Sequence, residues 1–185
     1  MKNTKAKRIY LRPITLQDAQ ALFAYRADPQ IYKYQSWQPH TIEDIHDFIV
    51  HRIVNKPDIP ETWYQQVICK IENDEIIGDC GLHFLKEMPT QVEIGITIKQ
   101  TYQKRGYARE TLELIFTYVF EKLKKHRIIA LVDPGNISSI RLLEHMKMRI
   151  EDKNKGKIGK KGKKFDDITY MISAKEWKQS RKKEN

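Results

Sequence analysis

One short segment of the chain combines residue types that suit the binding of a phosphate group: Gln103, Lys104, Arg105, Gly106, Tyr107 and Ala108. Gly106 and Ala108 are small enough for the backbone to approach a ligand closely, and Lys104 and Arg105 add positive charge. A helix that begins here would direct its free N–H groups and the positive end of its dipole at the same ligand. The segment therefore predicts a site for a phosphate or a pyrophosphate.

Other phosphate-binding patterns do not match this chain. The Walker pattern GxxxxGK[ST] is absent, and the dinucleotide pattern GxGxxG is absent both here and in the lysine-rich segment near the C-terminus. A single Gly-x-Ala before a helix is also typical of a tight turn that only opens the helix. The neighbouring segments must therefore decide between a ligand site and a turn.

The segment lies between a predicted strand and a predicted helix. Residues 91–98 favour a strand, residues 107–125 have an amphipathic helical pattern, and the apolar run 127–132 is typical of a buried parallel strand. Strand, loop, helix and strand in this order form a parallel crossover unit. Such a unit places the loop at the end of its first strand, beside the start of the helix.

The rest of the chain predicts further strands and helices around this unit. Thr15 and Thr41 are each followed three residues later by Asp, which indicates helix starts of the capping-box kind, and the apolar spacing after Thr41 continues to Ile53. Another helix follows Asn136. Strands are predicted at residues 9–14, 63–71 and 76–84 and on both sides of the lysine-rich segment.

Length and composition favour one globular domain over residues 1–185. A chain of 185 residues with 40% hydrophobic residues can bury a real core. No stretch approaches the roughly 20 apolar residues that cross a bilayer, and the basic N-terminus has no apolar segment behind it. We therefore expect a cytoplasmic protein with no membrane contact, as a monomer or a homodimer.

The net charge of +10 is concentrated near the C-terminus. Residues 153–185 hold 12 Lys/Arg and 4 Asp/Glu, whereas residues 1–152 hold 22 and 20. The densest part, residues 153–164, is predicted to be a mobile, solvated hairpin loop, and residues 178–185 a basic tail. Two interpretations stay open: the charge keeps the protein soluble, or it contacts RNA or the ribosome.

The cysteines and histidines do not form a recognisable site. Cys69 and Cys80 lie in strand-like runs and are expected to be buried free thiols, and only His83 lies near enough to Cys80 to activate it. The remaining histidines match no HExxH or HxH pattern, so no metal site is predicted.

Read with its neighbours, the loop resembles the acetyl-CoA motif Gln/Arg-x-x-Gly-x-Gly/Ala of the GNAT superfamily. The continuation Arg109-Glu110, and a second motif that starts at Asn136 with the pattern Asn-x-x-Ser-x-x-Leu-Leu-Glu, are similar to its ribosomal-protein N-terminal acetyltransferase-like (Rim-type) branch. Leu11-Arg12-Pro13 and residues 165–177 also resemble this branch. The resemblance covers about residues 8–177.

The resemblance implies an α/β fold, with a mixed, strongly twisted sheet of about seven strands and helices on both faces. It also implies that strands 93–98 and 127–132 splay apart to admit the pantetheine arm of acetyl-CoA. A bulge in the first of them would free backbone groups near Ile96 and Ile98, and the N–H near Ile96 would polarise the thioester. The implied cofactor contacts are Ile96, Thr97, Ile98, Gln103, Lys104, Arg105, Gly106, Tyr107, Ala108, Arg109, Asn136 and Ser139.

The implied reaction is attack of a neutral amine on the thioester. Because lysine-type amines are mostly protonated at pH 7, a base must remove a proton. Glu93 is the candidate base; alternatively, it is only an exposed residue of the sheet or an ion-pair partner. Many members of the family carry a Tyr as the acid at the position that Leu143 occupies here. Ser139 is therefore the candidate acid; alternatively, it only bonds to the cofactor or caps a helix turn. A second departure is Lys147, where the branch has a Gly that leaves the helix in a left-handed turn.

The acceptor is the least determined part. Tyr32, Tyr34, Trp37 and Trp63 are candidates to line its cleft, although core packing explains aromatic residues equally well. The basic loop disfavours a polycationic acceptor, so the α-amino group of a protein N-terminus is ranked first and a small-molecule amine (an antibiotic or a metabolite) second. The alternative from another class is a non-catalytic RNA- or ribosome-binding protein.

Overall fold

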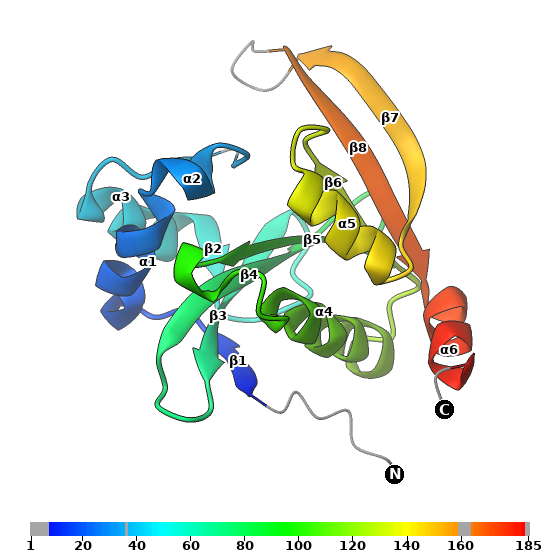
Figure 1. Cartoon of the computed structure of the whole chain (residues 1–185), viewed down its shortest axis with the longest axis horizontal. Coiled ribbons are helices and arrows are strands. Elements are labelled where there is room, and N and C mark those ends of the chain that lie inside the picture. The colour runs from blue at the N-terminus through cyan, green and yellow to red at the C-terminus, as the bar shows by residue number, and fades with distance from the viewer. Residues whose placement is uncertain (1–7, 36, 159–163, 184–185) are drawn as a thin grey trace.

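A computed structural model describes residues 8–35, 37–158 and 164–183 of the chain, and within them eight strands form one mixed sheet (Figure 1). The strand order is β1-β3-β4-β5-β6-β8-β7, and the short β2 pairs with β3. The β5–β6 and β2–β3 pairs are parallel, and the other pairs are antiparallel. The bounds are β1 Ile9–Pro13, β2 Ile53–Val54, β3 Thr62–Lys70, β4 Ile76–Phe84, β5 Gln91–Ile98, β6 Arg127–Val132, β7 Arg149–Ile158 and β8 Lys164–Ser173.

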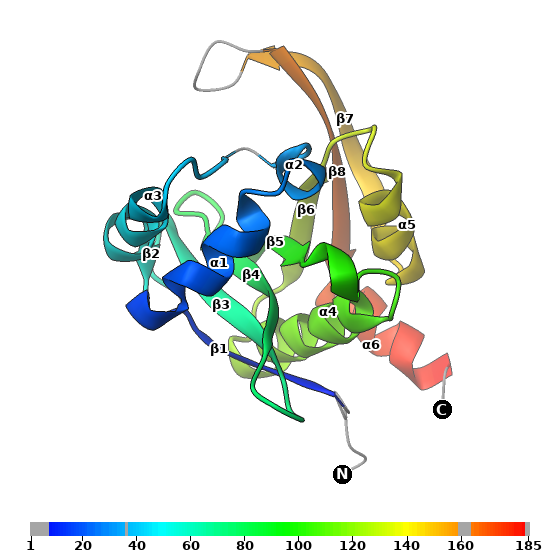
Figure 2. The same ribbon diagram turned by 60° about the vertical axis from the view of Figure 1, so that its left-hand side comes forward.

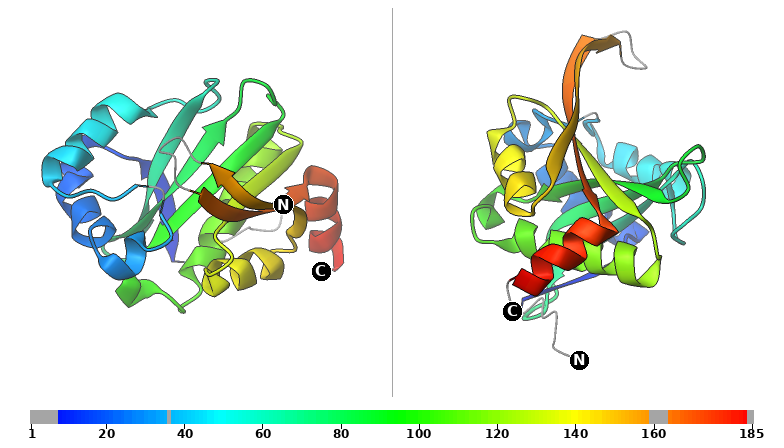
Figure 3. Two further views of the ribbon diagram at one scale, coloured as in Figure 1. Left: turned by 90° about the horizontal axis from the view of Figure 1, so that it is seen from above. Right: turned by 90° about the vertical axis from the view of Figure 1, so that its right-hand side faces the viewer.

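Helices cover both faces of the sheet, as predicted (Figure 3). On one face lie η1 (Leu16–Asp18), α1 (Ala19–Arg26), α2 (Pro29–Tyr32), α3 (Ile42–Asp47) and η2 (Phe48–Arg52). On the other face lie α4 (Tyr107–Thr117), η4 (Tyr118–Lys122), α5 (Ile137–His145) and α6 (Ala174–Lys183), and the single turn η3 (Gln100–Tyr102) follows β5. The β7–β8 hairpin stands out from the rest of the sheet (Figures 1 and 3).

Two apolar clusters hold these layers together. The larger packs α4, α5 and α6 on the sheet through fully buried side chains such as Leu112, Phe116 and Ile128. The smaller packs α1 and α3 on β3 through Leu22, Ile45 and Val67. Burial of a side chain of this size stabilises the fold by about 1.5–3 kcal/mol relative to its exposure to water.

The capping predictions are confirmed at the starts of η1 and α3. Asp18 accepts hydrogen bonds from the backbone N–H and the hydroxyl of Thr15, and the reciprocal capping box at η1 is complete. Thr41 and Asp44 form the same box at α3. These local signals need only the next few residues, which explains why the sequence shows them.

Several predicted ends were wrong. The helix predicted from Thr41 to Ile53 ends at Arg52, the last residue of η2. Ile53 begins the two-residue strand β2, because it pairs with Trp63 of β3. The long helix ends at Lys122 rather than residue 125, after a π-helical turn. The β7 and β8 strands extend into the segment predicted as a loop, of which residues 159–163 lie outside the described residues. Most of the segment predicted as a tail belongs to α6.

The crossover β5–α4–β6 is confirmed, and its two strands separate after a short pairing. β5 and β6 pair at three positions, the last of which joins Glu93 to Ile129. The predicted bulge in β5 was wrong, because the register between β4 and β5 is regular from Gly78↔Ile98 to Phe84↔Val92. The free edge of β5 arises instead because β6 diverges from it.

The end of α5 shows how the chain accommodates Lys147. Lys147 has φ of 62°, so it takes the left-handed conformation that glycine favours. The N–H of Met148 donates to Leu143 O at 3.0 Å and the N–H of Lys147 donates to Glu144 O at 2.9 Å, which is a Schellman motif. The predicted left-handed turn is therefore present without the glycine.

We expect Lys147→Gly to raise the free energy of unfolding by about 1 kcal/mol, because it removes the left-handed strain of a side-chain-bearing residue. Thermal unfolding should shift upward by about 2–4 °C for a chain of this size. Lys178→Gly, on the exposed side of α6, is the matched control and should lower stability by about 1 kcal/mol. A fall in unfolding temperature for Lys147→Gly would show that the lysine side chain stabilises the turn.

Candidate active site

The loop before α4 has the backbone of an anion site. Gly106 is the N-cap of α4 with φ of 85°, and Lys104 also has a positive φ, of 59°. No side chain caps this helix, and its first internal bond runs from Glu110 N–H to Gly106 O at 3.1 Å. The N–H groups of the preceding three residues, 107–109, are thus available to a ligand at the positive end of the helix dipole.

The loop is fixed to the body of the protein from two directions. Gln103 Nε2 donates to Ile98 O at 2.9 Å, which ties the loop to the end of β5. Arg8 Nη2 donates to Arg105 O at 2.9 Å, and Arg8 Nε donates to Glu110 Oε1 at 2.7 Å. The same guanidinium lies 4.3 Å from the ring centroid of Tyr107, which is itself buried. The Tyr107 side chain therefore supports the loop rather than facing a ligand.

Sequence reasoning missed Arg8. It lies 97 residues before Arg105, and only the position of β1 brings it to the loop. The N-terminal basic segment gives no local signal that separates this arginine from its neighbours.

We expect Arg8→Gln to raise KM for acetyl-CoA by about 10-fold, equivalent to about 1.4 kcal/mol, because the loop loses its support from β1. The value of kcat should change less than twofold, since Arg8 does not touch the reacting atoms. Steady-state kinetics at saturating acceptor would measure both quantities. An unchanged KM would show that the loop keeps its shape without Arg8. Arg52→Gln is the matched control, because Arg52 is an exposed arginine on η2.

The gap between β5 and β6 exposes one edge of β5. Successive residues of a strand direct their backbone groups to opposite neighbours. Lys99 N–H donates to Ile77 O in β4 at 2.8 Å, whereas Thr90 O accepts from Arg127 N–H at 3.3 Å. Even-numbered residues of β5 therefore face the β6 side, and Ile96 directs its N–H and C=O into the gap.

Two other predicted contacts on β5 are placed differently. The Ile98 carbonyl already accepts a hydrogen bond from the Gln103 side chain. The N–H of Ile98 is therefore the group that stays available to a ligand in the gap. Thr97 directs its backbone to β4, where it pairs with Asp79, and its hydroxyl accepts from Gln35 Nε2 at 3.2 Å. The structure thus does not bring Thr97 to the edge that Ile96 occupies.

The second motif forms the start of α5, beside β6. The Asn136 side-chain oxygen accepts from Ser139 N–H at 3.2 Å, so Asn136 is the N-cap of the helix. Its side-chain NH₂ stays available as a donor, and the half-buried Ser139 keeps its hydroxyl. Figure 2 shows α4 and α5 next to each other beside this part of the sheet. The capping interpretation is correct for Asn136 and compatible with a further contact.

Basic side chains surround the start of α4. Lys104 and Arg105 are exposed, and the Arg105 guanidinium lies 5.6 Å from the Tyr102 ring centroid. Arg109 links the two helices, because its Nη1 lies 3.0 Å from His145 Nε2 and its Nε donates to Glu113. The charge and the free N–H groups fit an acidic group such as the pyrophosphate of a nucleotide cofactor.

A row of side chains crosses β3, β4 and β5 on the face that α1 also covers. Trp63 pairs with His83, and His83 with Glu93, in the strand register. The Trp63 and His83 rings stack at 4.8 Å with an interplanar angle of 6°, and His83 Nδ1 lies 3.1 Å from Glu93 Oε2. Beside this row lie Gly81 and Gly95, and the side chains of Gln65 and Trp63 occupy the space above Gly81.

The predicted acceptor-side aromatics separate into two groups. Trp63 lies over the glycines, since its ring is 4.0 Å from the position of a Cβ on Gly95. Tyr34 lies against Gly135 in the loop between β6 and α5. Trp37 fits the core-packing alternative, because it stacks on Phe48 at 4.9 Å within the α1–α3 layer. Tyr32 is half-buried at the end of α2.

A buried ionic network joins α1 to β4 on this face. Tyr25 donates to Asp79 Oδ1 at 2.6 Å, and Arg26 forms an ion pair with both oxygens of the same carboxylate. Burial, with the neighbouring carboxylate, holds the pKa of the Tyr25 hydroxyl well above its usual value, so this group remains a donor. The network is structural and orients α1 over the sheet.

Both thiols are buried and unpaired, as predicted. Burial raises the pKa of the Cys80 thiol, which keeps it protonated. Cys80 is also one of the residues whose side chain enters the larger apolar cluster, on the opposite face of β4 from His83. A nucleophilic role for Cys80 has no support in this geometry.

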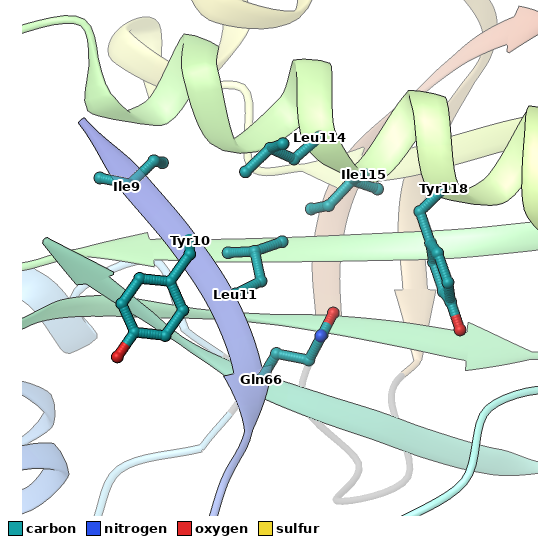
Figure 4. A pocket seen from close by; sticks show the side chains of 7 residues that line it. All are labelled: Ile9, Tyr10, Leu11, Gln66, Leu114, Ile115 and Tyr118. Atoms are coloured by element: carbon teal, nitrogen blue, oxygen red, sulfur yellow. The ribbon is translucent and has the colours of Figure 1, made fainter. Parts of the chain in front are cut away.

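Metal-binding clusters and membrane-spanning helices are both absent from the described part of the chain. It contains no group of three or more His, Cys, Asp or Glu side chains arranged to hold a metal ion, and no helix in it is long and apolar enough to cross a bilayer. A groove of about 410 Å³ lies between β1 and α4, and neither the loop residues nor Glu93 line it (Figure 4). It is lined by Ile9, Tyr10, Leu11, Gln66, Leu114, Ile115 and Tyr118.

Comparisons with known proteins agree with this geometry. Residues 8–149 match the family model described as "Acetyltransferase (GNAT) domain". The chain is 34% identical over 172 residues to "Uncharacterized N-acetyltransferase YnaD" of Bacillus subtilis, covering 92% of this chain and 96% of that protein. It is 30% identical over 174 residues to "Uncharacterized N-acetyltransferase p20" of Bacillus licheniformis, covering 94% and 96%.

A solved structure agrees as well. The crystal structure of a GNAT-family acetyltransferase from Bacillus anthracis superimposes with a TM-score of 0.80 at 28% identity, over 93% of this chain and 98% of that one. The splayed β5–β6 pair, the uncapped start of α4 and the family match have one explanation. The chain belongs to the GNAT family and is an acetyl-CoA-dependent N-acetyltransferase.

Proposed function

We propose that the acceptor is the α-amino group of a protein N-terminus, as in the Rim-type branch that the two motifs resemble. The observation that carries this proposal is the charge on the face of β4 and β5 that bears His83 and Glu93. Its two carboxylates are already paired, Glu93 with His83 and Asp79 with Arg26. A polyamine would need unpaired carboxylates for its additional ammonium groups, whereas a single α-amine would not.

The ordinary pKa of an α-amino group also favours it. That pKa is about 7.7–8.0, compared with about 10.4 for a lysine side chain, so a much larger fraction of the α-amine is neutral at pH 7. A neutral amine can attack a thioester once it lies in the gap between β5 and β6.

We assign the donor half of the reaction to the loop and the gap. Tyr107, Ala108 and Arg109 supply backbone N–H groups for the pyrophosphate, and Lys104 and Arg105 supply charge. The N–H of Ile96 is the donor for the thioester oxygen, because it faces the gap. Asn136 binds the pantetheine arm through its side-chain NH₂, and the Ser139 hydroxyl protonates the leaving thiolate. The Glu93 carboxylate lies on the side from which the acceptor enters.

Acetyl-CoA binding and acceptor choice can be tested separately. Acetyl-CoA at 100 times its dissociation constant should stabilise the protein by about 2.7 kcal/mol, measured by thermal unfolding. Thiol release would then be followed with short peptides, with the same peptides blocked at the N-terminus, with spermidine and with lysine methyl ester. Faster release with free N-termini than with spermidine supports the proposal. Equal release from blocked peptides, or preference for spermidine, contradicts it.

A further inference from the structure

We propose that the Nε2 atom of His83 is the base that removes the proton from the acceptor ammonium, and that Glu93 positions this imidazole. The proposal rests on the acceptor site described above and deepens it. It changes the role of Glu93 from the base itself to a residue that acts through its neighbour.

The hydrogen bond between the two residues fixes which nitrogen is free. An ionised carboxylate accepts hydrogen bonds and cannot donate them. The contact of 3.1 Å between Glu93 Oε2 and His83 Nδ1 therefore requires the proton on Nδ1. In the neutral ring Nε2 then carries the lone pair, and no hydrogen-bond partner for it is found in the described part of the chain. The ring is thus held in the tautomer that can accept a proton.

The imidazole is also held in orientation. Trp63 stacks on one side of the ring, at 4.8 Å and nearly parallel, and Glu93 fixes its edge. The His83 side chain keeps 19% of its surface exposed, so the fixed ring still reaches solvent or a substrate. A side chain fixed by packing and by a carboxylate, yet open at one nitrogen, is suited to proton transfer.

The imidazole lies beside the place where the acetyl group must be. His83 faces Glu93 across the strands, so Gly95 is its diagonal neighbour on β5, and diagonal neighbours lie within about 7–8 Å. Gly95 adds no side chain of its own between them, although the Trp63 ring lies 4.0 Å from the position of a Cβ there, and the residue after it, Ile96, directs its N–H into the gap. An amine above Gly95 would thus lie between His83 and the edge of β5.

The reaction balances with these groups. His83 Nε2 takes one proton from the acceptor ammonium, directly or through a water molecule, and later releases it to solvent. The neutral nitrogen then forms a bond to the thioester carbon, while the Ile96 N–H stabilises the charge on the oxygen. Collapse breaks the carbon–sulfur bond. The Ser139 hydroxyl gives its proton to the sulfur, which leaves as the thiol, and takes the second proton of the nitrogen in its place. The imidazolium formed in the first step is paired with Glu93.

The other charged groups near this row are already paired. On β3 the neighbour is the uncharged Trp63, and at the ends of β3 and β4 Glu61 accepts from Lys86 N–H. On β6 and β7, Arg127 pairs with Glu151. Asp79, two rows away on β4, pairs with Arg26. Glu93 is therefore the charged group that responds most directly to protonation of His83.

The test compares kcat of the whole chain and of its variants from pH 6.5 to pH 9.5, using as acceptor the amine from the panel above that gives the fastest thiol release. We expect His83→Gln to lower kcat by about 100-fold near pH 7. The loss should shrink toward pH 9.5, where the acceptor is neutral without help. A merely structural role of His83 would give the same loss at every pH. Glu93→Gln should lose only about 10-fold, since its amide oxygen can still accept from Nδ1.

His51→Gln, an exposed histidine on η2, is the matched control and should behave as the unaltered chain. The unfolding temperature shift caused by acetyl-CoA should persist in His83→Gln, which shows that the variant is folded and binds the donor. A 100-fold loss in Glu93→Gln with near-normal His83→Gln would make Glu93 the base and overturn the proposal. Losses below threefold in both variants would also overturn it. Because any active amine serves as acceptor, a preference for small molecules would contradict the proposed acceptor and leave this test decisive.

Discussion

Gly106→Val is expected to weaken acetyl-CoA binding by about 100-fold, or about 2.7 kcal/mol. Gly106 has φ of 85°, a conformation that costs a side-chain-bearing residue about 1–2 kcal/mol, and more when the residue is β-branched. A Cβ there would also lie 3.2 Å from Arg8 Nη2, the group that supports the loop. The loop would relax, and the N–H groups at the start of α4 would no longer converge on the pyrophosphate.

Calorimetric titration with acetyl-CoA would measure this loss of affinity. Lys147→Val is the matched control, because it places the same residue at a left-handed position, with φ of 62°, at the far end of α5. It should lower the unfolding temperature yet keep the affinity for acetyl-CoA. If Gly106→Val bound acetyl-CoA within threefold of the unaltered chain, the pyrophosphate would have to lie elsewhere.

The features of the site that the sequence predicted are those whose partners are close in the chain. Gly106 lies next to the strand and the helix that define its role, and Asn136 caps a helix by bonding to Ser139 three residues later. The strand alternation also predicted β3, β4, β5 and β6 to within about two residues. Spacing along the chain was sufficient for all of these.

The features that were missed depend on register and packing between distant segments. Arg8 reaches the loop only because β1 pairs with β3 at the edge of the sheet. His83 meets both Trp63 and Glu93 because three strands align at one residue level, which no local pattern encodes. The free edge of Ile96 was predicted from a bulge, but its physical cause is the divergence of β6. Trp37 stacks on Phe48, which agrees with the core-packing alternative that the sequence left open.

Asp79→Ala is expected to destabilise the fold by about 3–5 kcal/mol, because it leaves the buried Arg26 charge without its partner. Asp79 is 1% exposed and Arg26 is 9% exposed, so water cannot replace the lost carboxylate. The Tyr25 hydroxyl would lose its acceptor as well. For a chain of this length the unfolding temperature should fall by about 6–20 °C, which differential scanning calorimetry would measure.

A double variant separates the buried charge from packing in this network. If the unpaired guanidinium causes the loss, Arg26→Met combined with Asp79→Leu should recover most of it, because an apolar pair of similar size replaces the ion pair. Glu72→Ala removes an exposed partner of Lys70 and should change stability by less than about 1 kcal/mol. A double variant as unstable as Asp79→Ala would instead mean that the hydrogen bonds to Asp79 hold α1 on β4. Since α1 covers the face on which His83 and Glu93 lie, a displaced α1 would then lower kcat before it unfolds the chain.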